Sequence, residues 1–159
     1  MSDVKPEFVY VVFIASTPEA VWQALTTPEF TSQYWGGRRI ESDWQPGSPV
    51  RQLGKTGRIE SEGEVLEARP PHALSYTFQI AQMGDPPSRI TFEIEPVGEM
   101  VRLRLTHRHE LADSATQAAT IHGWPAIMSS LKSLLETGKP LPFTGLGFGP
   151  QHAGHEGQI

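Results

Sequence analysis

The chain of 159 residues contains no cysteine, so disulfide bonds and thiolate metal sites are excluded. This absence fits a cytoplasmic protein. No apolar run approaches the ~20 residues that a membrane-spanning helix needs, and residues 1–6 are too polar for a signal peptide. Basic residues are the minority: 13 Lys and Arg stand against 18 Asp and Glu, a formal net charge of −5. That balance argues against a nucleic-acid-binding surface, which is normally basic.

What remains is an ordinary globular composition. Hydrophobic residues make up 38% of the chain and the mean hydropathy is −0.32, which suit a soluble protein with a real core. No internal repeat divides the sequence. We therefore expect one folded domain over residues 1–139, followed at 140–159 by a Gly- and Pro-rich tail with little core-forming material.

The strongest helical pattern lies between Ser114 and Thr137. Apolar residues recur there at spacings of three and four, which places them on one helical stripe: Ile121, Trp124, Met128, Leu131 and Leu135. Ser114 and Gln117 form a capping box at the start, and Gly138 marks the end. Pro125 interrupts the pattern, because proline inside a helix costs about 3 kcal/mol. We expect a kink or restart there, with the main helix running from Trp124 to Thr137.

Almost everything before this helix has the pattern of β-strands. Phe8–Ile14 is a continuous β-branched and aromatic run, which predicts a strand covered on both faces. Two short helices follow, one beginning with Pro18 and one over Glu29–Tyr34. About six antiparallel strands then fill the chain up to residue 109, with Gly63 a candidate β-bulge. A long amphipathic helix after such a sheet is expected to cover its apolar face.

One predicted hairpin fixes a register. If Gly98-Glu99 is its turn, Glu95 faces Arg102 and Glu93 faces Arg104 on the outer side. The same register sets apolar residues opposite one another on the inner side, with the following pairs: Ile94 and Leu103, Phe92 and Leu105, and Ile90 and His107. Charged and apolar pairs agree, which supports the pairing.

The inner face of this sheet is rich in large apolar side chains that would face the helix. They are Tyr76, Phe78, Phe92 and Leu105 from strands and Trp124 and Met128 from the helix, with Trp35 and Trp44 closing one end. Such residues either fill the space as a packed core or line a cavity. Strand-spaced aromatics on their own favour the packed core.

Two histidines could carry chemistry. His107 and His109 fall on the same side as Leu105, where an imidazole could orient a ligand or exchange a proton. No carboxylate partner is evident on that face, so the simpler interpretation is that both side chains lie near the strand end and are solvated or hydrogen-bonded to backbone. His152 and His155 form a weak metal-like pair in the tail. We predict no catalytic residue, no metal site and no cofactor.

Several segments resemble the SRPBCC superfamily, and within it the bacterial branch related to the C-terminal domain of the Hsp90 activator Aha1. The matching stretches are residues 14–26 (IASTPEAVWQALT), 28–29, 34–37 (YWGG), 63–67 (GEVLE), 70–77 (PPHALSYT) and 123–124. The resemblance spans roughly residues 7–138. It implies an α+β helix-grip fold, in which a curved antiparallel sheet of about six to seven strands wraps a long C-terminal helix.

The resemblance also implies a cavity between sheet and helix, since cavities are common in this superfamily. We therefore expect a small hydrophobic or aromatic ligand, contacted by the aromatic side chains above and by His107. The alternatives are an enzyme of cyclase or hydrolase type acting on such a ligand, and a chaperone-associated or regulatory interaction module. A homodimer is also possible. The Hsp90 activator has a further N-terminal domain for which this chain has no room, so no Hsp90 partnership is expected.

Overall fold

The computed structural model describes residues 5–142, which form one seven-stranded antiparallel sheet and three helices. The strand order is β1-β7-β6-β5-β4-β3-β2. The elements are β1 (Glu7–Ile14), α1 (Pro18–Thr26), α2 (Pro28–Tyr34), β2 (Arg39–Ser42), β3 (Pro49–Leu53), β4 (Ile59–Arg69), β5 (Ala73–Ile80), β6 (Ser88–Val97), β7 (Met100–Arg108) and α3 (Ala115–Thr137).

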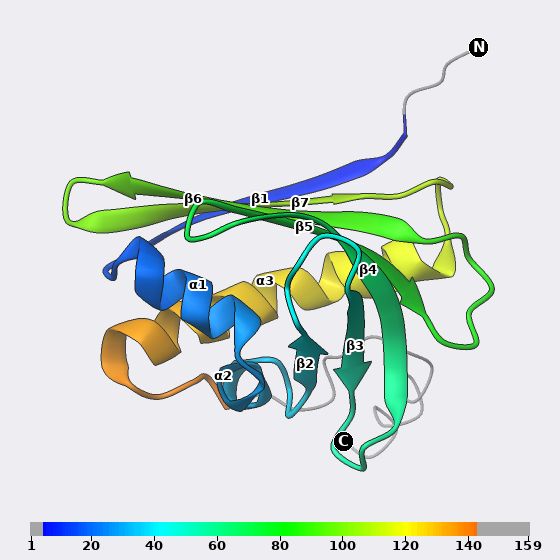
Figure 1. The fold of residues 1–159 in the computed structure, drawn as a ribbon, viewed down its shortest axis with the longest axis horizontal. Coiled ribbons are helices and arrows are strands. Elements are labelled where there is room, and N and C mark those ends of the chain that lie inside the picture. Colours follow the sequence, from blue (N-terminus) through cyan, green and yellow to red (C-terminus); the bar gives the residue numbers. More distant parts are fainter. Residues whose placement is uncertain (1–4, 143–159) are drawn as a thin grey trace.

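The sheet curves around α3 (Figure 1). The strands β1, β5, β6 and β7 form a layer above the helix, and β4, β3 and β2 turn down beside it, while α1 and α2 lie at the other end. This arrangement confirms the predicted α+β helix-grip fold, including the two short helices after the first strand. None of the helices between residues 5 and 142 is both long and apolar enough to cross a membrane.

Helix α3 runs without interruption from Ala115 to Thr137, so the predicted restart of the helix at Pro125 was wrong. The Ser114 hydroxyl accepts a hydrogen bond from the Gln117 amide (3.0 Å), and Gly138 ends the helix with φ of 84°. Pro125 removes one backbone donor, yet the residues around it, Trp124, Ile127 and Met128, are completely buried. Burying such side chains is worth roughly 1.5–3 kcal/mol each, which outweighs the local cost of the proline.

The β6–β7 hairpin has the predicted register throughout. Phe92 pairs with Leu105 and Ile90 with His107 on the inner face, and Glu93 pairs with Arg104 on the outer face. Gly98 takes a φ of 62° in the turn, a conformation that glycine adopts easily. Charge pairing and apolar pairing therefore located this hairpin correctly from the sequence.

Strand β1 is not covered on both faces, contrary to the sequence-based expectation. It forms an edge of the sheet, and its outward side chains Val9, Val11 and Phe13 are 42%, 38% and 42% exposed. An unbroken apolar run is typical of a buried strand, but here only the alternate residues Phe8, Tyr10 and Val12 pack toward the core. The other face of β1 remains open.

Gly63 lies where β4 and β5 approach closely, and the bulge falls elsewhere. The register between these strands shifts between Val65 and Glu67, two to four residues after Gly63. A Cβ atom at Gly63 would clash with the backbone carbonyl of Thr77. Glycine is required at this position because neighbouring backbone occupies the space of a side chain.

We expect Gly63→Ala to lower the free energy of unfolding by at least about 2 kcal/mol, because backbone atoms cannot move aside cheaply. Gly47→Ala is the matched control: Gly47 has a φ of 90° but no atom within 4 Å of an added Cβ. It should cost only about 1–2 kcal/mol of conformational strain. Urea unfolding followed by tryptophan fluorescence measures both, and a smaller loss for Gly63→Ala than for Gly47→Ala would contradict the close approach.

Candidate functional site

The predicted ligand-contacting side chains come together between the sheet and α3. Rings of seven of them form one connected set of contacts, with centroid separations from 5.3 Å for Trp35–Trp124 to 6.5 Å for Tyr76–Phe92. The set comprises Trp35, Trp44, Tyr76, Phe78, Phe92, His107 and Trp124. Leu105 and Met128, the other two predicted residues, are fully buried in the same core.

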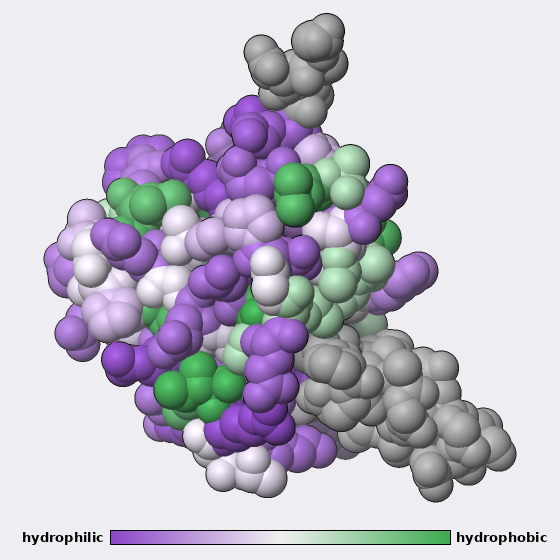
Figure 2. All heavy atoms as spheres, turned by 90° about the vertical axis from the view of Figure 1, so that its right-hand side faces the viewer, coloured by the Kyte–Doolittle hydropathy of each residue, from purple (hydrophilic) through white to green (hydrophobic). Residues whose placement is uncertain are grey.

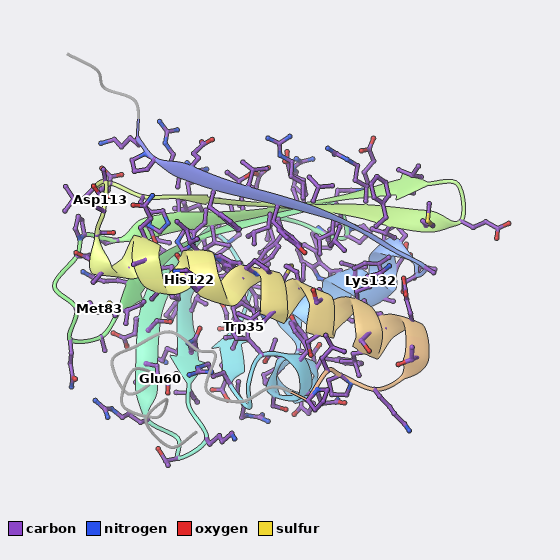
Figure 3. The ribbon with its side chains drawn as sticks, turned by 180° about the vertical axis from the view of Figure 1, so that it is seen from behind. Trp35, Glu60, Met83, Asp113, His122 and Lys132 are labelled. Carbon is purple, nitrogen blue, oxygen red and sulfur yellow. The ribbon has the colours of Figure 1, made fainter. Side chains whose placement is uncertain are left out.

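Strand alternation explains why the sheet residues meet. Inward side chains occur at every second position, so Tyr76 and Phe78 of β5 lie on the same face as Phe92 of β6. Helix α3 supplies Trp124 from below, and Trp35 follows the end of α2 (Figure 3). Trp44 lies at the margin, where its indole N–H donates to the Thr26 carbonyl at 2.8 Å.

His107 sits at the centre of a directional hydrogen-bond chain. The indole N–H of Trp124 can only donate, and it lies 2.9 Å from Nδ1 of His107. Nδ1 must therefore be unprotonated, which assigns the proton to Nε2, 2.7 Å from the Ser88 hydroxyl. The Ser88 hydroxyl in turn donates to the Phe78 carbonyl at 3.0 Å. Every group in this chain is satisfied when His107 is neutral.

This series of hydrogen bonds does not activate Ser88 as a nucleophile. A serine is activated when a histidine accepts its proton, but the Ser88 proton is directed to a carbonyl and His107 has no free lone pair. Burial, followed by the neighbouring His109, lowers the pKa of His107 well below its usual value. Both histidines are at most 1% exposed, so the interpretation of them as solvated side chains was wrong.

His109 stacks on His107, with ring centroids 4.1 Å apart. Its two ring nitrogens are buried and have no hydrogen-bond partner within residues 5–142. Burial lowers the pKa of His109, and the Asp85 carboxylate opposes that shift to a smaller degree. Asp85 accepts bonds from the Thr116 amide (2.9 Å) and hydroxyl (2.8 Å), which tie the β5–β6 loop to the start of α3.

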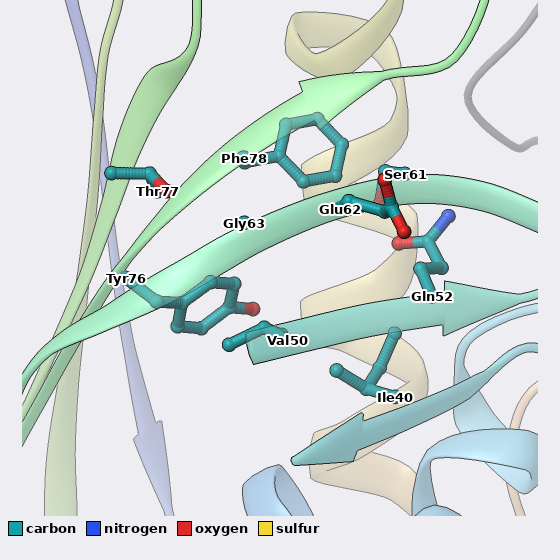
Figure 4. Close-up of a pocket in the computed structure, with 9 residues that line it drawn as sticks. All are labelled: Ile40, Val50, Gln52, Ser61, Glu62, Gly63, Tyr76, Thr77 and Phe78. Carbon is teal, nitrogen blue, oxygen red and sulfur yellow. The ribbon is translucent and has the colours of Figure 1, made fainter. Parts of the chain in front are cut away.

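A small pocket opens beside this core, under β3, β4 and β5 (Figure 4). Its volume of about 10 Å³ is close to that of one water molecule. The residues that line it are Ile40, Val50, Gln52, Ser61, Glu62, Gly63, Tyr76, Thr77 and Phe78. Figure 4 shows the Tyr76 hydroxyl directed toward Val50, and no partner for this hydroxyl is found among the described residues. Burial raises the pKa of Tyr76 well above its ordinary value.

The aromatic core is closed in this conformation. Apart from Trp44, each predicted ligand-contacting residue is at most 3% exposed. Accessible surface includes the walls of internal cavities, so these residues border almost no space that water can enter. A ligand larger than water would have to separate the sheet from α3 or displace side chains.

Sequence reasoning missed the polar residues that complete the site. Ser88 was not among the predicted site residues, although it stands two residues before Ile90 and so extends the inward alternation of β6. Gln52 and Ser61, both 3% exposed, alternate inward in the same way on β3 and β4. Across residues 5–142 no three His, Cys, Asp or Glu side chains converge to hold a metal ion. His152 and His155 lie outside the described residues.

The fold and core geometry agree with a family comparison. The family model described as "Activator of Hsp90 ATPase homolog 1-like protein" matches residues 15–136, which include α1, all of β2 to β7 and nearly all of α3. The chain belongs to this family. A comparison with curated proteins finds no match.

Several solved structures have a similar fold. The Aha1 dimer of Colwellia psychrerythraea is 24% identical, with a TM-score of 0.70 over 84% of this chain and 98% of that one. Protein MLL2253 of Mesorhizobium loti is 27% identical, with a TM-score of 0.69 over 82% and 96%. DynU16, described as a protein of the dynemicin biosynthetic locus, is 21% identical, with a TM-score of 0.72 over 88% of this chain and 49% of that one.

The neutral, buried His107 gives this Aha1-like protein a pH-dependent stability. Unfolded histidine binds a proton near pH 6.5, whereas the folded form of His107 resists protonation. Its stabilising contribution is therefore complete above pH 6.5 and is lost as the pH falls below that value. We expect a loss of up to about 1.4 kcal/mol per pH unit from this residue, with His109 acting in the same direction.

Urea unfolding between pH 7.5 and pH 5 measures this dependence. The variant His107→Gln should lose part of the slope, while His122→Gln, at an exposed position of α3, should keep the slope of the wild type. Equal slopes for all three proteins would show that His107 titrates normally in the folded state.

Proposed function

We propose that this Aha1-like protein binds a small hydrophobic or aromatic molecule between the sheet and α3. The supporting observation is the presence of buried polar atoms without partners beside a connected aromatic core. They are the indole N–H of Trp35 and the ring nitrogens of His109. The Tyr76 hydroxyl, on a residue that lines the small pocket, also has no hydrogen-bond partner among the described residues. A buried polar group left unpaired costs about 1–3 kcal/mol. A ligand with an oxygen or nitrogen acceptor would recover part of that cost at Trp35, and it would add a hydrogen bond if it also accepted from the Tyr76 hydroxyl.

The small pocket under β3, β4 and β5 is the proposed starting point for the ligand. It already combines apolar walls, such as Ile40 and Val50, with the polar side chains of Gln52 and Tyr76. Convergent polar groups in an apolar setting are typical of ligand sites. Because the pocket holds only about one water molecule, binding requires side chains of the pocket to be displaced or α3 and the sheet to move apart. The measured affinity would then include the free energy of that opening.

The other two functions receive less support. The hydroxyl of Ser88 lies within reach of His107, as an enzyme would require, but its proton is directed to the Phe78 carbonyl. An interaction module should display a large exposed apolar patch. On the face shown in Figure 2, most residues are hydrophilic and the hydrophobic ones form small groups. A cytoplasmic location, suggested by the lack of cysteine, is part of this proposal.

The similar fold of DynU16, described as a protein of the dynemicin biosynthetic locus, is consistent with this choice. The likeness concerns the fold alone. Ligand binding by the present chain therefore has to be tested directly.

We expect a matched pair of probes, 1-naphthol and 1-methylnaphthalene, to bind and raise the thermal unfolding midpoint. Tryptophan fluorescence should change saturably, because Trp35 and Trp124 lie in the proposed site. Tyr76→Phe should weaken naphthol binding by about 2- to 10-fold, the value of one hydrogen bond, and leave methylnaphthalene binding unchanged.

The control is Tyr10→Phe, which removes a hydroxyl from a half-buried tyrosine of β1, away from the pocket. Its affinities for both probes should match those of the wild type. Absence of saturable binding and of any thermal shift with both probes would overturn the proposed function.

A further inference from the structure

The two edges of the sheet are built differently. Strand β2, at one edge, has only four residues, includes the charged Arg39 and Glu41, and packs against α2. Strand β1, at the other edge, has eight residues, with a charge only at Glu7, no proline and no register shift against β7. Short length, charge and a covering helix prevent an edge from pairing with another chain. These devices protect β2 and are missing from most of β1.

The direction of the open backbone groups on β1 follows from one hydrogen bond. The Lys132 ammonium of α3 donates to the Phe13 carbonyl at 2.6 Å from outside the sheet. Backbone groups alternate in direction along a strand, so the odd-numbered residues of β1 point away from β7. The Pro6 carbonyl agrees with this alternation, since it accepts from the His109 amide on the β7 side. The open groups therefore belong to Glu7, Val9 and Val11.

Helix α3 closes the remainder of this edge. Besides the Lys132 bond to Phe13, the Glu136 carboxylate accepts a hydrogen bond from the Ala15 amide at 2.8 Å. The unprotected part is thus the segment from Glu7 to Val11. Its outward side chains Val9 and Val11 are 42% and 38% exposed, which leaves apolar surface beside the unpaired backbone groups.

We propose that a second copy of this chain pairs with β1 in antiparallel orientation, across a two-fold axis at Val9. An antiparallel pair exchanges two hydrogen bonds at each pair of residues whose backbone groups face one another. With the axis at Val9, Val9 of one copy faces Val9 of the other, and Glu7 faces Val11 at both ends. All the open groups of both copies are then used, which is the self-complementarity that a two-fold dimer requires.

Charge supports this register. Within one copy, Val11 lies beside Arg104 of β7, and Glu7 lies beside Arg108. In the proposed pair, Glu7 of one copy lies next to Val11 of the other, and Arg104 of that second copy lies one strand further away, beyond Val11. Each carboxylate thus has its own Arg108 on the neighbouring strand and a second arginine two strands away on the other side, and the two Val9 side chains meet at the axis.

The pairing is small, and this sets the strength of the dimer. Five residues of strand per copy bury far less than the ~800 Å² per partner of a typical stable complex. We therefore expect a dissociation constant of roughly 10–100 µM and a monomer at lower concentrations. The candidate site between the sheet and α3 takes no part in this pairing, which involves the edge of β1 and its outward side chains.

The test compares Val11→Lys with Val97→Lys. Both valines are 38% exposed, but Val97 lies at the end of β6, next to the hairpin turn, away from the β1 edge. Sedimentation velocity across a concentration series should show the wild type and Val97→Lys changing from monomer to dimer. In Val11→Lys the dissociation constant should rise at least about tenfold, because each dimer would place two lysines where the two β1 strands pair.

Hydrogen exchange of the wild type provides a second readout that needs no variant. The amide protons of Val9 and Val11 should exchange more slowly at concentrations where the dimer forms, whereas that of Phe13 should change less because α3 already covers its end of the strand. A wild type that stays monomeric, a dimer equally strong in both variants, or unchanged exchange at Val9 and Val11 would overturn the proposal.

Discussion

The contact between α3 and the inner face of the sheet, centred on Trp124, is the interaction on which the rest of the structure depends. Trp124 packs against Trp35 and Phe92 and donates its indole N–H to His107, so one side chain links the helix, α2, β6 and β7. Its placement keeps α3 continuous through Pro125. It also fixes the tautomer of His107, which in turn orients Ser88. The helical register at one residue thereby determines the polar arrangement of the core.

Much of this fold could be predicted because short-range patterns and long-range pairing agreed. The β6–β7 hairpin was located from alternation on both faces, and α3 from its capping residues and apolar stripe. Pro125 was misjudged because its cost is local, whereas the compensating burial of Trp124 and Ile127 depends on tertiary contacts that no sequence window contains. Strand β1 was misjudged because an apolar run does not reveal whether a strand lies at the centre or the edge of a sheet.

The candidate site, too, could be predicted from the sequence only in part. Its aromatic residues could be predicted, because inward alternation on strands places Tyr76, Phe78 and Phe92 on one face. The role of His107 could not, since it depends on Ser88 and Trp124 meeting it from two other elements. Charge pairs on neighbouring strands are foreseeable, while a hydrogen-bond chain across three elements requires knowledge of how those elements pack. The hydrogen bonds of polar core residues therefore cannot be predicted until the packing of the elements that carry them is known.

A closed core that contains unpaired polar atoms would be stabilised by a ligand that supplies hydrogen-bond partners for them. The chain of bonds through His107 is complete, so opening the core there would break favourable contacts. The indole N–H of Trp35 is in the opposite condition, because it is buried without a partner and would gain one if a ligand with an acceptor entered. Such a ligand would also meet the Tyr76 side chain, which lines the small pocket. Opening on the side of β3, β4 and α2 would reach these groups without breaking the bonds through His107, whereas reaching the unpaired nitrogens of His109 would disturb the ring of His107 stacked on it. The residues hydrogen-bonded through His107 would then stay in place while β3, β4 and α2 move.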